Sequence, residues 1–304
     1  VHGSILAIAG ILVRIIGMLY RIPVVNIIGS EGNGIYGAAF NIYNIMLVLS
    51  SYGLPMAVSK LVSARFTKKR YKSAAKVLRC SLMVAVCTGG IAALLVFFGA
   101  SFIENVIYGG GLPGLAIPLR ILAPTIFLVA ILGVIRGFFQ GQSTMIPTAV
   151  SQILEQIVNA IVSIAAGYGM MKAFASSPDV AAYGAAGSTL GTAMGALTAV
   201  LFMGFLYAVY TPTFNRLKRK DRHTENQSTG QICKIIIYTM IPIILGQTFY
   251  QISALLDDVL FSNIMVVRGA SANITRDLGN FSSSYTLLIS IPQGIACLLY
   301  TSDA

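Results

Sequence analysis

Two arginines, Arg14 and Arg21, interrupt the first apolar stretch of the chain, which covers about residues 4–28. They lie seven residues apart, or two turns of an α-helix, so their side chains share one face. Gly10 and Gly17 fall on the same face, which is therefore predicted to meet protein or a cavity instead of lipid. A charge at membrane depth costs about 2.5–3.5 kcal/mol or more, and a guanidinium group matches phosphate with bidentate geometry. We interpret Arg14 and Arg21 as candidate ligands of an anionic group; the alternative is that they snorkel to an interface or pair with a carboxylate.

Polar side chains also form stripes along two further apolar stretches, at about 35–62 and 147–171. Helical periodicity places the members of each stripe within a narrow arc. Stripes on several helices favour a shared hydrated cavity over scattered helix–helix hydrogen bonds. The additional candidate substrate-binding residues are Asn41, Asn44, Gln152, Glu155, Gln156 and Asn159. Glu155 either neutralises an arginine or takes up a proton, and Arg136 is either a cavity residue or an interfacial anchor.

Adjacent carboxylates, Asp257 and Asp258, lie in the seventh apolar stretch, at about 232–262. Together with carbonyl and hydroxyl oxygens they would suit a coupling cation, Na⁺ or H⁺; the alternative is a salt bridge to another helix. The two histidines and four cysteines have no metal-ligand spacing, and no glycine-rich phosphate loop is present. We therefore predict neither an enzyme nor an organic cofactor.

The composition indicates the elements that must position these residues. Of the 304 residues 56% are hydrophobic and only 10% are charged, against about 25% charged in a soluble domain. A helix needs about 20 apolar residues to cross the hydrocarbon core of a bilayer. The prediction is an all-α integral membrane bundle with apolar stretches at about 4–28, 35–62, 77–102, 117–139, 147–171, 183–210, 232–262 and 284–300.

The net charge of +11 is concentrated between these stretches. Two clusters hold most of the basic residues: Arg65, Lys68, Lys69, Arg70, Lys72, Lys76 and Arg79, then Arg216, Lys218, Arg219, Lys220, Arg222 and Lys234. This arrangement is typical of cytoplasmic loops, so the N-terminus is predicted to be cytoplasmic and nucleic acid is not an expected partner. We predict a first six-helix lobe at 1–210, a basic cytoplasmic linker at 211–231 and the start of a second lobe at 232–304. Because the chain begins without methionine and ends within an apolar stretch, it is expected to be part of a longer protein.

Five motifs carry a resemblance to a known family: Arg14–Gly17 (RIIG), Gly29–Tyr36 (GSEGNGIY), Tyr52–Lys60 (YGLPMAVSK), Arg136–Gly141 (RGFFQG) and Pro147–Gln156 (PTAVSQILEQ). They resemble the polysaccharide-export and lipid II flippase branch of the multidrug/oligosaccharidyl-lipid/polysaccharide (MOP) exporter superfamily, in its stage V sporulation protein B-like group. The resemblance implies a MATE-like fold, with two six-helix lobes around a central cavity that opens alternately to each side.

The resemblance also implies roles for some residues. Arg14 and Arg21 stand where family members carry cavity arginines that hold a lipid diphosphate, and Asp257 or Asp258 stands where some members have a sodium-site aspartate. Some lipid II flippases carry arginines in the second and eighth helices, whereas the corresponding stretches here offer only Lys60. The resemblance therefore predicts a lipid-linked saccharide as substrate without specifying lipid II.

The leading hypothesis is a flippase of the bacterial plasma membrane that moves a polyprenyl-diphosphate saccharide, with membrane lipid and cell-wall synthesis machinery as partners. The alternatives are a cation-coupled multidrug antiporter of the same superfamily and a non-transporting scaffold for sporulation or wall synthesis. An enzyme of lipid-linked sugar assembly is disfavoured because the outer loops are short and poor in candidate acids and bases.

Overall fold

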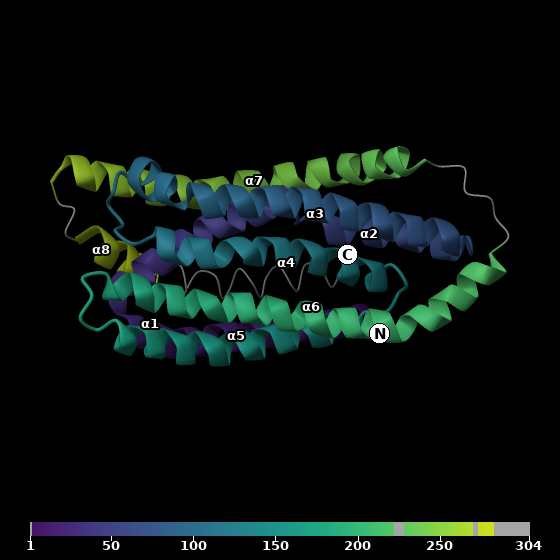
Figure 1. Ribbon diagram of the computed structural model, residues 1–304, viewed down its shortest axis with the longest axis horizontal. Helices are drawn as coiled ribbons and strands as arrows, with labels where there is room; N and C mark the ends of the chain where they lie inside the picture. The colour runs from purple at the N-terminus through teal and green to yellow at the C-terminus, as the bar shows by residue number, and fades with distance from the viewer. Residues whose placement is uncertain (1, 222–227, 270–272, 283–304) are drawn as a thin grey trace.

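The computed structural model describes residues 2–221, 228–269 and 273–282, and within these ranges it contains helices and no strand. The long helices lie side by side along one axis (Figure 1). They are α1 (His2–Ser50), α2 (Leu54–Thr67), α3 (Tyr71–Phe102), α4 (Ala116–Gln140), α5 (Ile146–Ala173), α6 (Val180–Lys220) and α7 (Thr229–Val267), with a π-helical turn η1 (Ile103–Ile107) and a short α8 (Ile274–Phe281). The predicted all-α bundle is confirmed.

The first two predicted stretches meet at Gly29, inside the residue range of α1. Gly29 adopts φ 70° and ψ 178°, a conformation that side chains disfavour and glycine tolerates. The chain folds back at Gly29. As a result, the guanidinium carbon of Arg21, before the bend, lies 5.5 Å from the ring centroid of Tyr36, after the bend. This bend places the predicted arginine face beside the second half of α1.

The prediction of one continuous segment over 35–62 was wrong. The helix ends at Ser50 and a new one begins at Leu54. Pro55 lies in the first turn of α2, where its missing N–H does no harm, although it could not have continued the preceding helix. Gly53 fits in the break because a β-carbon there would lie 3.0 Å from the β-carbon of Met240 on α7.

Among the described residues, six helical runs are long and apolar enough to cross a membrane, and they contain the first seven predicted stretches. The first run, Ile8–Thr67, includes both the bend at Gly29 and the break before α2. Large apolar side chains such as Phe98, Leu201 and Phe205 are exposed on their surfaces, as expected for positions that face lipid. The eighth stretch, at 284–300, lies outside the described residues.

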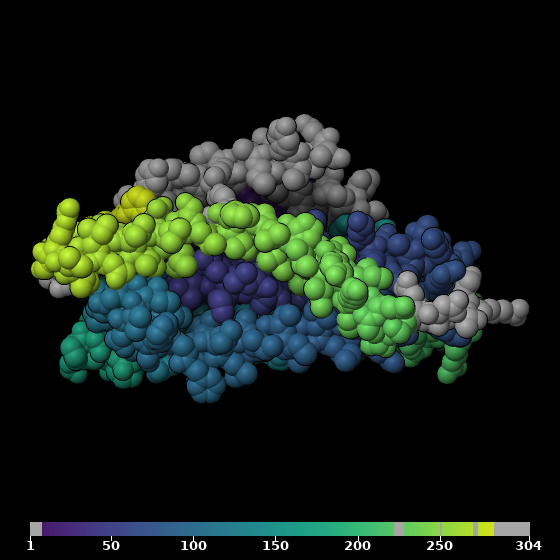
Figure 2. All heavy atoms as spheres, turned by 90° about the horizontal axis from the view of Figure 1, so that it is seen from above, coloured from purple at the N-terminus to yellow at the C-terminus, as the bar shows by residue number. Residues whose placement is uncertain are grey.

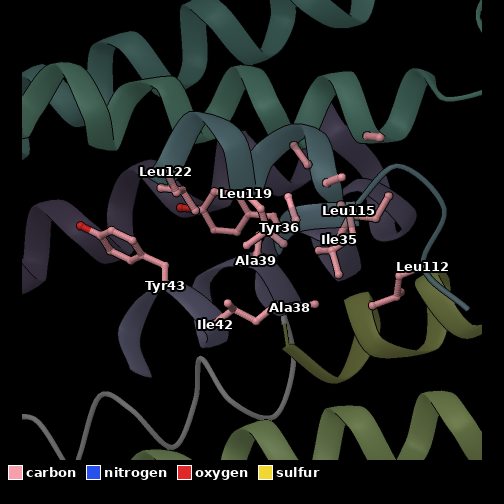
Figure 3. Packing of buried hydrophobic residues seen from close by; sticks show 14 of the residues in the cluster. Ile35, Tyr36, Ala38, Ala39, Ile42, Tyr43, Leu112, Leu115, Leu119 and Leu122 are labelled. Carbon is pink, nitrogen blue, oxygen red and sulfur yellow. The ribbon is translucent and has the colours of Figure 1, made fainter. Parts of the chain in front are cut away.

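Two apolar cores hold the helices together. In the first, Tyr36 and Ala39 of α1 pack against Leu115, Leu119 and Leu122 at the start of α4 (Figure 3). In the second, toward the opposite end of the bundle, rings from α2, α4 and α6 form an aromatic cluster whose members are Phe66, Phe138, Tyr207, Tyr210 and Phe214. Close-packed rings at this end join helices 2, 4 and 6 into one unit.

The N-terminal end of α1, the α2–α3 turn, the end of α6 and the start of α7 gather at the same end of the bundle (Figure 1). The basic residues Lys68, Lys69, Arg70, Arg219 and Lys220 lie there and are exposed. Helix α7 then runs along the bundle, and Figure 2 shows it lying across α1 and α3. The bend at Gly29, the η1 turn and α8 form the other end.

Candidate functional site

The two predicted arginines differ in their surroundings. Arg14 is exposed on the surface of the first half of α1, whereas Arg21 is part-buried and its Nε atom is buried without a hydrogen-bond acceptor among the described residues. Within the described ranges neither guanidinium is paired with a carboxylate. The guanidinium of Arg21 lies over the ring of Tyr36 instead. This face of α1 therefore carries two positive charges that the described part of the chain leaves uncompensated.

Gln156 of α5 lies beside this face. A β-carbon on Gly17 would be 4.0 Å from Gln156 Oε1, and that oxygen is buried without a donor in the described structure. Gly17 lies one helical turn before Arg21, so α1 and α5 bring an unused acceptor and an unused donor to neighbouring positions. Both groups have hydrogen-bonding capacity left for a ligand or water.

Asn159 is fully engaged in contacts between helices. Its Nδ2 donates to the Tyr20 hydroxyl at 3.2 Å, and its Oδ1 accepts from Ser163 Oγ at 2.9 Å and lies 3.5 Å from Thr192 Oγ1. Because Asn159 is only 6% exposed, these contacts tie α1, α5 and α6 together. The geometry favours a structural role for Asn159, one turn away from Gln156.

Glu155 has a clear partner in the structure. Its Oε2 accepts a hydrogen bond from Arg136 Nη2 of α4 at 2.8 Å, and Arg136 Nε donates to Ser151 Oγ at 2.9 Å. The two side chains are 14% and 23% exposed, so solvent screens the pair only in part. Of the two roles considered for Glu155, the geometry favours neutralising an arginine, and Arg136 is the arginine that pairs with it.

Asn41, in the second half of α1, reaches a different neighbour, α7. Asn41 Nδ2 donates to Asp258 Oδ2, and Asp258 is part-buried whereas Asp257 is exposed. Asn44, one turn after Asn41, and Gln152 of α5 are also part-buried. No group of three or more acidic, histidine or cysteine side chains is close enough to hold a metal ion among the described residues. Because Asp258 is bonded to Asn41 and Asp257 is exposed, Asp258 is the carboxylate of the pair that faces α1.

Sequence reasoning missed several polar contacts of α1. Asn33 Nδ2 donates to the carbonyl of Gly279 in α8 at 2.8 Å, and Asn33 is 1% exposed. Tyr36 under Arg21 and Tyr20 beside Asn159 were not singled out either. Tyr36 belongs to a quoted motif, but an aromatic residue in an apolar stretch carries no polar signal that would separate it from the core.

The length, apolar surface and side-by-side packing of these helices define a multi-pass integral membrane protein, and comparison with solved structures shows that its fold is MATE-like. An inward-facing multidrug resistance MATE family transporter of the MOP superfamily matches with a TM-score of 0.65 and 15% identity, over 95% of this chain and 60% of that chain. A MOP superfamily transporter from Pyrococcus furiosus, described as having a binding pocket of reverse polarity, matches with a TM-score of 0.65 and 17% identity, over 91% and 61% of the two chains.

The sequence comparison places the chain more closely. Residues 2–302 match the model of the polysaccharide biosynthesis protein family, and the chain belongs to that family. Stage V sporulation protein B of Bacillus subtilis is 27% identical over 98% of this chain and 56% of its own length. Lipid II flippase MurJ of the same organism is 35% identical over 53% of this chain and 31% of its own length. The chain thus matches about half or less of the length of these relatives.

Proposed function

We propose that this chain is part of a flippase that moves a lipid-linked saccharide across the bacterial plasma membrane, with the N-terminus and the basic loops on the cytoplasmic side. The observation that carries the proposal is the α1 face on which Arg14 and Arg21 lack a carboxylate partner within the described structure. A guanidinium whose donors are unused is suited to the oxygens of a phosphate or diphosphate group.

The charge balance of the neighbouring helices supports an anionic substrate over a cationic one. A carrier of organic cations needs an accessible negative charge, and Glu155 is the acidic residue in the polar stripe of α5. Because Arg136 holds Glu155 at 2.8 Å, the pair is neutral overall, and the charges of Arg14 and Arg21 lie beside a polar stripe of α5 whose carboxylate is already paired. The relatives named a lipid II flippase and a sporulation protein are consistent with a lipid-linked precursor of the cell wall or a related polysaccharide.

The mechanism we propose is alternating access. The first six helices bind the anionic headgroup through Arg14 and Arg21, with Gln156 as a neutral hydrogen-bonding neighbour, while the lipid tail stays in the membrane. Helices of the second lobe, which begin with α7 in this chain, then rock against the first lobe. A coupling cation, Na⁺ or H⁺, would act through Asp258 and bias the cycle, since moving one charge through 100 mV is worth about 2.3 kcal/mol.

Flipping of a fluorescent polyprenyl-diphosphate saccharide by the full-length protein in liposomes tests the proposal. We expect Arg14→Gln and Arg21→Gln each to slow flipping by about tenfold or more, because a hydrogen bond to a charged group contributes about 1.5–3 kcal/mol. The matched control is Arg120→Gln. It removes an exposed arginine near the start of α4 that donates a hydrogen bond to Ser101. If both α1 variants flip at the rate of the Arg120 variant, the proposed anion site is wrong.

A further inference from the structure

The side chain beneath Arg21 is an aromatic ring and not an acid. The guanidinium carbon of Arg21 lies 5.5 Å from the centroid of the Tyr36 ring, within the range of a cation–π interaction. Unlike a carboxylate, the ring carries no charge and offers no oxygen in this contact, so the guanidinium keeps N–H donors for another acceptor. A carboxylate in the same place would have used those donors and cancelled the charge.

Tyr36 is itself held firmly in position. It is 4% exposed, its ring lies 4.5 Å from that of Phe40, and it packs in the core formed with Leu115 and Leu119 of α4 (Figure 3). A ring in such a core has little freedom to move. Tyr36 therefore gives a firmly held contact to an arginine side chain that would otherwise sample many rotamers.

A second contact fixes the first half of α1 relative to the ring. Tyr20 precedes Arg21 in the chain and accepts a hydrogen bond from Asn159 at 3.2 Å. Through Asn159 this contact continues to Ser163 of α5. The orientation of α1 at Arg21 is thus tied to helix α5 as well as to the ring.

We propose that Tyr36 is a positioning residue that holds the Arg21 guanidinium ready for the phosphate oxygens of the substrate without neutralising it. The inference rests on the proposed function, because it assumes that Arg21 binds an anionic headgroup. Its physical basis is that an ordered side chain loses less entropy on binding than a free one, so the ring raises affinity although it does not touch the substrate.

The test separates affinity from maximal rate in the flipping assay with the full-length protein. We expect Tyr36→Met to raise the half-saturating lipid concentration by about three- to thirtyfold, with a smaller change in maximal rate. Tyr36→Phe keeps the ring and loses only the hydroxyl, so it should raise that concentration less than Tyr36→Met does. Tyr43→Met is the matched control, because Tyr43 is 5% exposed and lies in the same core and on the same helix but not under Arg21.

A series of ring-substituted residues at position 36 tests the cation–π contact without removing the ring from the core. Increasingly fluorinated phenylalanines at position 36 keep the shape of the ring while they weaken its negative face. We expect the half-saturating concentration to rise with each added fluorine in the wild-type background and to stay constant when Arg21→Gln is also present. A flat series in both backgrounds overturns the positioning role.

The same experiment distinguishes the two proposals. If Arg21→Gln alone leaves the half-saturating concentration unchanged, the proposed function is wrong at this residue, whatever the behaviour of Tyr36. If Arg21→Gln weakens binding but Tyr36→Met has no more effect than Tyr43→Met, the anion site stands and the role of Tyr36 is wrong.

Discussion

Arg136 Nη2 of α4 lies 2.8 Å from Glu155 Oε2 of α5, and this ion pair determines the charge that the polar stripe of α5 presents. Because Arg136 pairs with Glu155, that carboxylate is not available to neutralise Arg14 or Arg21 of α1. Selection of an anionic substrate would therefore depend on this ion pair as well as on the two arginines.

Breaking the pair should cost stability more than activity. Glu155→Gln leaves Arg136 part-buried without its charged partner, so we expect a destabilisation of about 1–3 kcal/mol. The double variant Glu155→Gln with Arg136→Gln should recover part of that loss, as a double-mutant cycle would reveal. Thermal unfolding in detergent measures both, and Glu31→Gln, which changes an exposed carboxylate of α1, is the control.

Asn159 should prove to be a structural residue. Its side chain joins Tyr20 and Ser163, and Asn159→Ala would leave the Tyr20 hydroxyl without that donor. We expect destabilisation of about 1–3 kcal/mol, whereas Gln156→Ala should weaken substrate binding with little loss of stability. Thermal unfolding together with half-saturating lipid concentrations separates the two; equal effects of both variants on both quantities would contradict this assignment.

The contact between α1 and α8 requires glycine. A β-carbon on Gly279 would overlap the carbonyl oxygen of Ser30, and Asn33 bonds the Gly279 carbonyl at the same place. Gly279→Ala is expected to separate the two helices, which spin labels on the exposed residues Glu31 and Arg276 of the full-length protein would register as a longer distance.

Gly246→Ala in α7 is the control for this experiment, because no atom of the described residues lies within 4 Å of a β-carbon there. An unchanged label distance in Gly279→Ala would mean that the helices do not approach this closely in the full-length protein.

Asp258 should couple cation binding to the contact between α1 and α7. Its carboxylate accepts a hydrogen bond from Asn41 of α1, so a cation bound to this carboxylate would change that contact. We expect Asp258→Asn to abolish the dependence of flipping on a Na⁺ or H⁺ gradient, whereas Asp257→Asn, at the exposed neighbour, should retain it. Flipping rates in liposomes with imposed gradients measure this, and a gradient dependence that survives Asp258→Asn would exclude the site.

Much of the fold follows from the sequence, because each helix that crosses a bilayer needs about 20 mostly apolar residues. Apolar stretches of membrane-spanning length predicted seven helical segments that the structure contains, and helical periodicity predicted the shared face of Arg14 and Arg21. The break before Pro55 was missed because Ser51 and Gly53 do not interrupt apolarity, although proline and close packing against Met240 stop the helix there.

The partners of the polar residues could not be predicted in the same way. Glu155 and Arg136 lie on neighbouring helices, and Asn41 and Asp258 are separated by 217 residues. Periodicity assigns each residue to a face of its own helix but does not say which helix that face meets. Tyr36 was missed for a related reason, since its role depends on the bend at Gly29 that brings Arg21 over its ring.

Comparing substrates of different charge tests most directly whether the protein selects an anionic headgroup. The full-length protein in liposomes would be given a fluorescent polyprenyl-diphosphate saccharide, the same isoprenoid with a neutral glycosidic link, and an organic cation. The account predicts that the diphosphate lipid is flipped, that the neutral lipid is flipped far more slowly, and that the cation is not transported. Transport of the cation without flipping of the diphosphate lipid would contradict it and would favour the multidrug antiporter.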